Sequence, residues 1–408
     1  MTSTAAHGGA IPAATAVAVP TARVRDPRLD VFRGLAMFLI LVAHTPGNAW
    51  TLWIPARWGF SDATEIFVFC SGMASAIAFG STFDRAGWPL GTARVLFRCW
   101  QVYWAHVGLF MATLALTVAL TQSGLGDKNY WGQLNLWPVI VDGADWDNAN
   151  IILSFMTLRY VPNYFDILPM YFVVLLMMPA FVALARVSFP LAAGASVLLW
   201  LVAQRGVTDA LGWGHLGLPA EPWTDRNWFF NPFAWQLIFF TGFSLMRGWL
   251  PRPPVVPSLI GLAIAIVLAS VLVSSIGSRV LGLEFAAPWR EANALWMDKS
   301  DLGPLRYVHF LALGYLAWAA CGDRGARLVA LAQGRARPPI AWITKVGQQS
   351  LAIFVFSMAF SRFNGFLLDV IGRNWATWTL VNLCSFAVLI GVAYGVGWFK
   401  SAPWRAAA

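Results

Sequence analysis

The stretch from Leu29 to Trp50 combines a long apolar run with two residues that can do chemistry, Arg33 and His44. A cation and an imidazole are costly in hydrocarbon, so inside an apolar segment they usually mark a functional site. The two residues are eleven positions apart, which on a helix places them on one face, roughly 16 Å apart along the axis. A plainer interpretation makes Arg33 an anchor at the membrane edge and His44 a hydrogen-bonded core histidine.

The composition places this helix in a membrane protein. The chain has 408 residues, of which 58% are hydrophobic and 12% are charged, whereas a soluble protein carries about twice that share of charge. Long apolar runs recur along the sequence, so we expect an all-α polytopic membrane protein. The cysteines and histidines show no paired spacing, and we expect no metal site.

Ten apolar segments are expected to cross the membrane. They lie at about 30–50, 63–80, 95–120, 167–185, 189–204, 233–248, 257–277, 304–321, 346–362 and 376–398. With the N-terminus in the cytoplasm, the inside segments hold 16 basic and 4 acidic residues, and the outside segments hold 11 basic and 15 acidic residues. This balance follows the positive-inside rule, so both termini are predicted to be cytoplasmic, with Arg33 on the cytoplasmic side and His44 toward the outer face.

The predicted organisation is a disordered cytoplasmic tail (1–24), one transmembrane domain (25–400) and a short cytoplasmic tail (401–408). The first long outer loop, 121–166, is rich in aromatic, carboxylate and amide side chains, which are typical of a carbohydrate-binding surface. The alternative is that its tryptophans sit at the level of the lipid headgroups. These residues are Trp131, Trp137, Trp146, Asp142, Asp145, Asp147, Asn148 and Asn150.

The second apolar segment begins with two acids, Asp62 and Glu65, which share a helix face because they are three residues apart. One interpretation is a capping arrangement, in which Ser61 or Asp62 caps the helix and Glu65 folds back. The other is catalytic, because a carboxylate near the outer end of the first helix could orient and polarise the His44 ring.

Further polar residues fall at the predicted outer ends of helices, where ordinary capping and interhelical hydrogen bonds are the simpler explanation for each. Taken together they predict one polar cavity on the side of His44. These residues are Asp166, Asn231, Gln236, Arg306 and His309.

The Arg33-x10-His44 spacing resembles the first-helix signature of the acyltransferase-3 superfamily of membrane acyltransferases. Within it, the chain is similar to the OpgC family. The segments that carry this similarity are RDPRLDVFRGLA, AHTPGN, FSDATEIFVFCSG, YFDILPMY, NPFAWQLIFFTG, DKSDLGPLRYVHFLALGY and GQQSLAIFVFS.

The resemblance implies an inner-membrane enzyme that succinylates osmoregulated periplasmic glucans, with succinyl-CoA as a cytoplasmic co-substrate and no permanently bound cofactor. His44 would match the essential histidine of the first helix, and Arg33 its paired arginine. The soluble hydrolase-like domain that related enzymes often carry is absent from this sequence, which leaves the partner of the histidine unassigned.

The mechanistic hypothesis is direct acyl transfer with neutral His44 as general base and Glu65 or Asp62 holding its ring. Arg306, His309, Asn231 or Gln236 would stabilise the oxyanion, and Arg306 would bind the second carboxylate of a succinyl group. Basic residues of the cytoplasmic face would bind the CoA phosphates: Arg33, Arg94, Arg98 and the segment 324–345.

Two other function classes remain open. A solute transporter would also have ten spans and a polar cavity that contains Arg33 and His44, although the repeated halves common in transporters are not visible. A non-catalytic anchor for a glucan-handling complex would explain the topology without using the two residues. The acyl group could also be acetyl or another dicarboxylate, and we expect no nucleic-acid partner.

Overall fold

The computed structural model describes residues 27–126, 128–141, 148–334 and 336–405, without the side chains of residues 148 and 149. Over these ranges the chain is helical and contains no β-strand, apart from one isolated bridge between Pro219 and Asn227. The all-α prediction is therefore confirmed for the described part. The predicted tail 1–24 lies outside it, as do Asp142, Asp145, Trp146 and Asp147 of the first outer loop.

The helices include six short 3-10 or π segments, which are labelled η. In chain order the elements are α1 (Pro27–His44), η1 (Ala49–Trp53), α2 (Pro55–Trp58), α3 (Ala63–Ser75), η2 (Ala76–Gly80), α4 (Ser81–Gln122), η3 (Gly132–Leu134), α5 (Trp137–Ile140), α6 (Asn148–Met156), α7 (Ile167–Val187), α8 (Phe189–Val202), α9 (Arg205–Ala210), α10 (Pro232–Arg247), α11 (Pro257–Val273), α12 (Gly277–Val280), α13 (Ala286–Ala292), η4 (Ala294–Met297), α14 (Pro304–Cys321), η5 (Asp323–Gly325), α15 (Ala326–Gln333), α16 (Arg337–Gln348), α17 (Ser350–Ile371), α18 (Trp375–Ser401) and η6 (Pro403–Arg405).

Four helical stretches of the described chain are long and apolar enough to cross a membrane: Ala63–Gln122, Ile167–Val187, Ser350–Ile371 and Trp375–Arg405. α8 and α11 are apolar but shorter. Each of the ten expected segments lies on helical chain, while their number as membrane crossings and the cytoplasmic position of the termini stay predictions.

Three boundaries differ from the sequence-based expectation. α1 ends at His44 rather than near residue 50. The chain turns directly after it, at Pro46 and at Gly47, whose φ of +67° favours glycine. The expected loop at 81–94 consists of helical residues, but the chain does reverse there: Gly87 (φ 80°, ψ 176°) separates two helical parts of α4, and Arg94 donates to the Thr82 hydroxyl, twelve residues earlier, at 2.5 Å. The expected segment 346–362 is divided at Gln349, between α16 and α17.

Two helix pairs pack through glycines. A Cβ atom on Gly72 of α3 would lie 2.0 Å from the carbonyl oxygen of Phe239 in α10, and one on Gly242 of α10 would lie 2.3 Å from that of Phe69 in α3. In the same way, a Cβ on Gly34 of α1 would lie 2.0 Å from the carbonyl oxygen of Ile343 in α16. Small residues of this kind let helix backbones approach closely inside a membrane.

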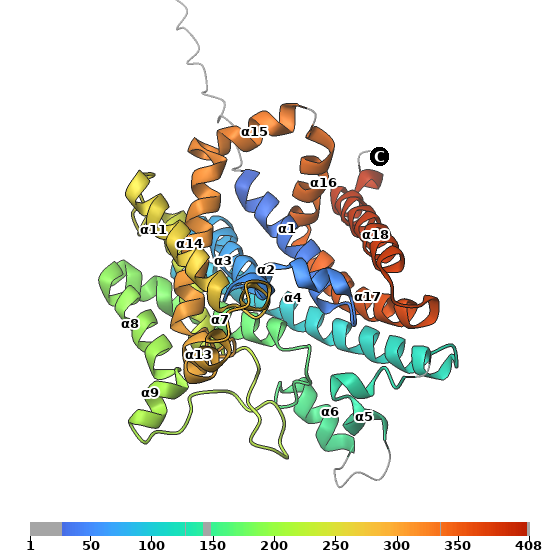
Figure 1. The fold of residues 1–408 in the computed structure, drawn as a ribbon. Helices are drawn as coiled ribbons and strands as arrows, with labels where there is room; N and C mark the ends of the chain where they lie inside the picture. Colours follow the sequence, from blue (N-terminus) through green and yellow to red (C-terminus); the bar gives the residue numbers. More distant parts are fainter. Residues whose placement is uncertain (1–26, 127, 142–147, 335, 406–408) are drawn as a thin grey trace, which may run out of the picture.

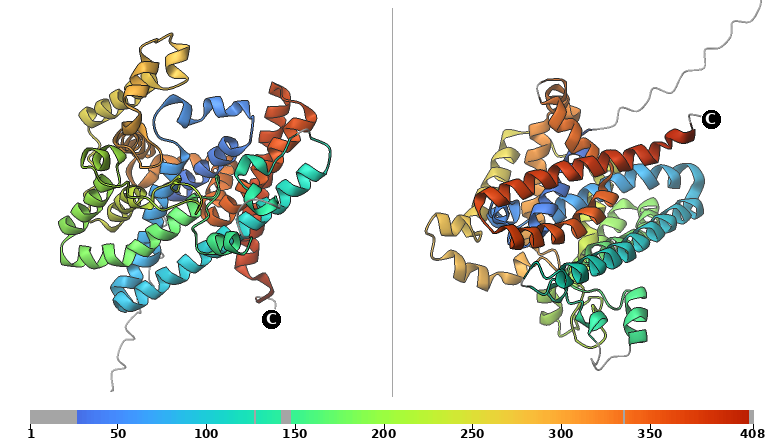
Figure 2. Two further views of the ribbon diagram at one scale, coloured as in Figure 1. Left: turned by 90° about the horizontal axis from the view of Figure 1, so that it is seen from below. Right: turned by 90° about the vertical axis from the view of Figure 1, so that its right-hand side faces the viewer.

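The elements are arranged so that the two ends of α1 face different sides of the molecule. The first turn of α1, α15, α16 and the last turn of α18 lie together at the top of Figure 1, and we call this end the Arg33 side. The short helices α5, α6, α9 and α13 lie at the opposite end, the His44 side. Figure 2 shows α4 and α18 running obliquely past the central helices.

Candidate active site

His44, the last residue of α1, has its ring fixed by the backbone of its own helix. The ring atom Nδ1 lies 2.8 Å from the carbonyl oxygen of Ile40. Because a carbonyl oxygen can only accept, Nδ1 must carry a proton, and in the neutral ring Nε2 is then the unprotonated nitrogen. This nitrogen is the atom that can take a proton from a substrate.

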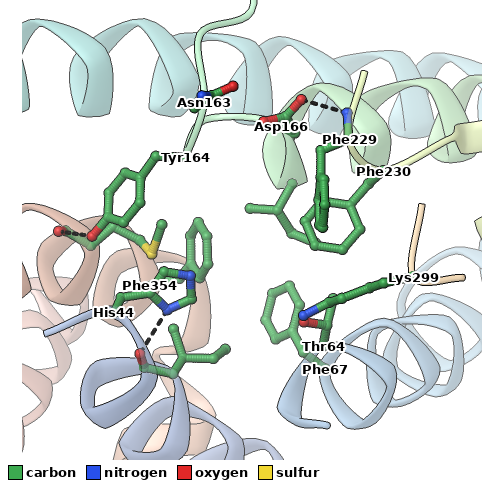
Figure 3. Close-up of a pocket in the computed structure, with 13 residues that line it drawn as sticks. His44, Thr64, Phe67, Asn163, Tyr164, Asp166, Phe229, Phe230, Lys299 and Phe354 are labelled. Carbon is green, nitrogen blue, oxygen red and sulfur yellow. Dashed lines mark hydrogen bonds between the residues drawn. The ribbon is translucent and has the colours of Figure 1, made fainter. Parts of the chain in front are cut away.

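The ring borders a cavity of about 430 Å³ on the His44 side. Figure 3 shows His44 and Lys299 pointing into it from opposite sides, with Asp166 above them. The walls are mostly apolar and aromatic, and a few polar groups converge between them, as is usual for small-molecule sites. The lining residues are Ile40, His44, Thr64, Phe67, Asn163, Tyr164, Asp166, Ile167, Phe229, Phe230, Lys299, Phe354 and Met358.

Tyr164 forms the wall beside the imidazole. Its ring meets that of His44 edge-to-face, with 5.3 Å between the ring centroids, and its hydroxyl donates to the carbonyl oxygen of Met358 at 2.5 Å. The backbone of Tyr164 has φ +90°, a conformation that costs a bulky residue roughly 1–3 kcal/mol and is found mainly at functional sites. In the sequence Tyr164 stands out only as the first residue of the segment YFDILPMY, because the strain arises only in the folded chain.

Asp62 and Glu65 belong to a network of charges beside the cavity. They form the predicted capping box of α3, with Glu65 Oε2 accepting from the Asp62 amide at 2.8 Å. Arg306 donates to Glu65 Oε1 from Nε at 2.7 Å, and the Lys299 ammonium lies 2.5 Å from Asp62. Burial by itself would raise the pKa of Asp62, but Lys299 and Arg306 hold it well below its ordinary range.

Two of the expectations concern residues of this network. The His44 ring is held by Ile40, whereas Glu65 accepts hydrogen bonds from Arg306 and from the Asp62 amide. Arg306 was expected to bind an acyl carboxylate, but the buried Glu65 already neutralises it. Asp62, Glu65 and Arg306 are therefore held in contact with one another and with Lys299.

Asp166 is the expected residue that does reach the cavity along with His44. It precedes α7, and its Oδ1 accepts from the backbone amide of Phe229 at 2.8 Å. Burial raises the pKa of Asp166 to about 6, although the Phe229 amide and Arg226 act in the opposite direction.

The two amide side chains expected at the site, Asn231 and Gln236, form hydrogen bonds between α10 and its neighbouring segments. Asn231 caps α10 and donates to Asp301 Oδ1 at 2.9 Å. Gln236 donates to the backbone of Ser196 in α8 at 2.7 Å. Neither lines the cavity, so the expectation of one polar cavity shared by all these groups is met only in part.

His309 is paired with Ser61, which the sequence suggested only as a cap of the helix. The Ser61 hydroxyl lies 2.7 Å from His309 Nδ1, and the Ser61 amide donates to the same nitrogen. Both residues are buried, and neither borders the cavity of His44. This arrangement is suited to holding the start of α3 against α14.

Arg33 lies at the opposite end of α1 from His44, as its position in the sequence requires. Its guanidinium donates to the Ser350 hydroxyl at the start of α17. A second cavity of about 380 Å³ lies at this end, bordered by Pro27 of α1 and by Arg337, Lys345 and Tyr394.

Lys299 and Arg362 are the two site cations that sequence reasoning missed. Lys299 lies in the loop before α14 and comes to the cavity through its pair with Asp62. Arg362 lies on α17, with its guanidinium carbon 4.0 Å from the centroid of the Tyr164 ring. Both were counted only as outer-side charges in the sequence, because their neighbours are distant along the chain.

Comparison with known proteins gives one match. The family described as OpgC protein matches residues 25–401, which is nearly the whole chain and includes every helix that borders the cavity. The searches of curated proteins and of solved structures found no match. The chain belongs to the OpgC family.

Proposed function

We propose that this membrane protein is an O-acyltransferase that moves an acyl group, in the first place succinyl, from acyl-CoA to a hydroxyl of a periplasmic glucan. The observation that carries the proposal is the His44 ring, whose Nδ1 proton is bound by Ile40 and whose other nitrogen is free to act as a base at the cavity. Family membership supports the same reaction class, and the bacterial inner membrane is the proposed location.

In the proposed step, the oxygen of a glucan hydroxyl attacks the carbonyl carbon of the thioester while His44 Nε2 takes the hydroxyl proton. The tetrahedral intermediate then collapses and the C–S bond breaks. The CoA thiolate leaves and receives the proton from the imidazolium, so the products are a sugar ester and free CoA thiol. Lys299, the ammonium that borders the cavity, is the proposed donor to the oxyanion.

The CoA phosphates are proposed to bind on the Arg33 side, in the second cavity. Arg337 and Lys345 border this cavity, and none of its lining residues is acidic. Phosphate groups favour such a surface because of its positive charge. This arrangement assigns the two ends of α1 to the two substrates, with the nucleotide at the first turn and the sugar near His44.

The test is thiol release by purified protein in detergent, with succinyl-CoA as donor and a periplasmic glucan as acceptor. Wild type should release thiol only when glucan is present, and His44→Ala should lower the rate by about 10²- to 10⁴-fold, the usual contribution of a general base. The melting temperature of the variant serves as the folding control. Retained transfer by a well-folded His44→Ala protein would remove His44 from the mechanism.

A further inference from the structure

Arg362 lies on the same face of α17 as the cavity wall. Phe354, Met358 and Arg362 follow one another at intervals of four residues, so they share one side of the helix. Phe354 and Met358 both border the cavity of His44. Arg362 therefore lies one turn beyond Met358 toward the His44 side, next to the cavity lining although it is not itself a lining residue.

The guanidinium of Arg362 is placed close to the imidazole by Tyr164. It covers the Tyr164 ring, with its carbon 4.0 Å from the centroid, and the edge-to-face contact of this ring with His44 spans 5.3 Å. Arg362, Lys299 and Asp62 are the charged groups that act on the His44 ring. Whatever binds to Arg362 therefore lies beside the proposed base.

Within the described chain, Arg362 has no ion-pair partner, in contrast to the other two cations beside the site. Lys299 is paired with Asp62, and Arg306 with Glu65. The Nε atom of Arg362 is buried and has no hydrogen-bond partner. Keeping a guanidinium charged at such a position costs free energy of desolvation when no anion is paired with it.

The nearby acids do not supply this anion. Asp166, at the top of the cavity in Figure 3, accepts from the Phe229 backbone. Asp369, two turns farther along α17, is bound by Lys128 and Arg373. No acid of the described residues therefore pairs with Arg362, which leaves this position open to the anionic group of a bound molecule.

We infer that Arg362 binds the free carboxylate of a dicarboxylic acyl group while the other end of that group is transferred beside His44. A planar guanidinium matches a carboxylate in a two-point contact, and the apolar wall formed by Phe67, Phe354 and Met358 suits the short carbon chain between the two ends. This inference rests on the proposed acyl transfer and assigns to Arg362 the role that the sequence had suggested for Arg306.

The experiment compares two donors that differ only at the inferred contact. Succinyl-CoA and butyryl-CoA both carry a four-carbon acyl group, and butyryl has a methyl group in place of the free carboxylate. Wild type, Arg362→Gln and Arg362→Lys are each assayed for glucan-dependent thiol release with both donors, and kcat/KM is determined for each. Lys128→Gln is the control, because it removes another cation of the His44 side that is paired with Asp369 on α17.

Wild type and Lys128→Gln are expected to prefer succinyl-CoA. Arg362→Gln should lower kcat/KM for succinyl-CoA by about 30-fold or more, the usual effect of removing one partner from a buried charge pair, and should leave butyryl-CoA nearly unchanged. Arg362→Lys should restore part of the preference because it restores the charge without the planar contact.

An unchanged donor ratio in Arg362→Gln, or an equal loss with both donors, would overturn the inference and leave acyl transfer itself intact. The proposed function fails differently: wild type would then release thiol from neither donor when glucan is added. Melting temperatures of all four proteins show whether a loss of rate reflects a loss of folded protein.

Discussion

At the scale of single residues, the site separates groups that hold the structure from groups that face the substrate. His44 and Glu65 were expected to act together, yet Ile40 fixes the imidazole and Arg306 binds the carboxylate. The carbonyl that holds the imidazole lies four residues earlier on the same helix, whereas Glu65 meets a cation that is 241 residues away. Sequence spacing could therefore identify His44 but could not identify its partner.

Asp166 gives a prediction about pH. Its pKa is raised by burial to about 6, above that of an unfolded aspartate near 3.9. The contribution of the protonated Asp166 carboxyl to the free energy of unfolding is complete below about pH 4. It is lost as the pH rises through about 6, a change on the order of 3 kcal/mol. Asp166→Asn keeps an acceptor for the Phe229 amide and should remove this dependence. We expect the melting temperature of wild type to fall more between pH 4.5 and pH 7 than that of the variant; parallel curves would contradict this.

At the scale of elements, most of the fold could be predicted because apolar runs determine where helices form. The positions of the expected segments on helical chain and the Asp62–Glu65 capping box both follow from local sequence. The reversal of the chain near Gly87 falls within the expected break between residues 80 and 95, whereas the break at Gln349 could not be predicted with the same ease. A polar residue between two helical segments is compatible with either a continuous helix or a break.

The close contact of α3 with α10 gives a prediction about packing. Gly72→Ala should lower the melting temperature, since the new methyl group would lie 2.0 Å from the Phe239 carbonyl oxygen and the two backbones would have to separate. The matched control is Gly261→Ala in α11, where nothing lies within 4 Å of the added atom. Alanine favours a helix over glycine by about 1 kcal/mol, so the control should be neutral or slightly stabilising. Equal effects of the two changes would show that the α3–α10 contact can relax.

At the scale of the whole molecule, the site depends on residues that only the folded chain brings together. The cavity draws its polar groups from α1, from the loop before α7, from the loop before α14 and from α3. Neither Lys299 nor Arg362 was given a role from the sequence. Their importance follows from the folded chain, in which Lys299 is paired with Asp62 and no acid of the described residues forms an ion pair with Arg362. A pattern in the sequence could locate the helices but could not show which of these cations has an acidic partner in the folded chain.

The two ends of α1 give the last prediction, because the proposed CoA site and the proposed base lie on opposite sides of the molecule. Replacing both Arg337 and Lys345 by Gln should raise KM for acyl-CoA while leaving kcat nearly unchanged, since these cations would bind the phosphates equally well before and during transfer. Added salt should raise KM of the wild type in the same direction, because Arg337 is exposed and its charge is screened.

The control for this pair is Arg85→Gln, which removes an exposed cation that does not border the second cavity. If KM of the double variant matches that of Arg85→Gln, the nucleotide binds elsewhere. A fall in kcat with an unchanged KM would instead mean that the Arg33 side influences the chemical step near His44. The rise in KM that we expect, with the control unaffected, would place the nucleotide and the sugar at opposite ends of one helix, so that the thioester end of CoA has to extend from the Arg33 side to His44.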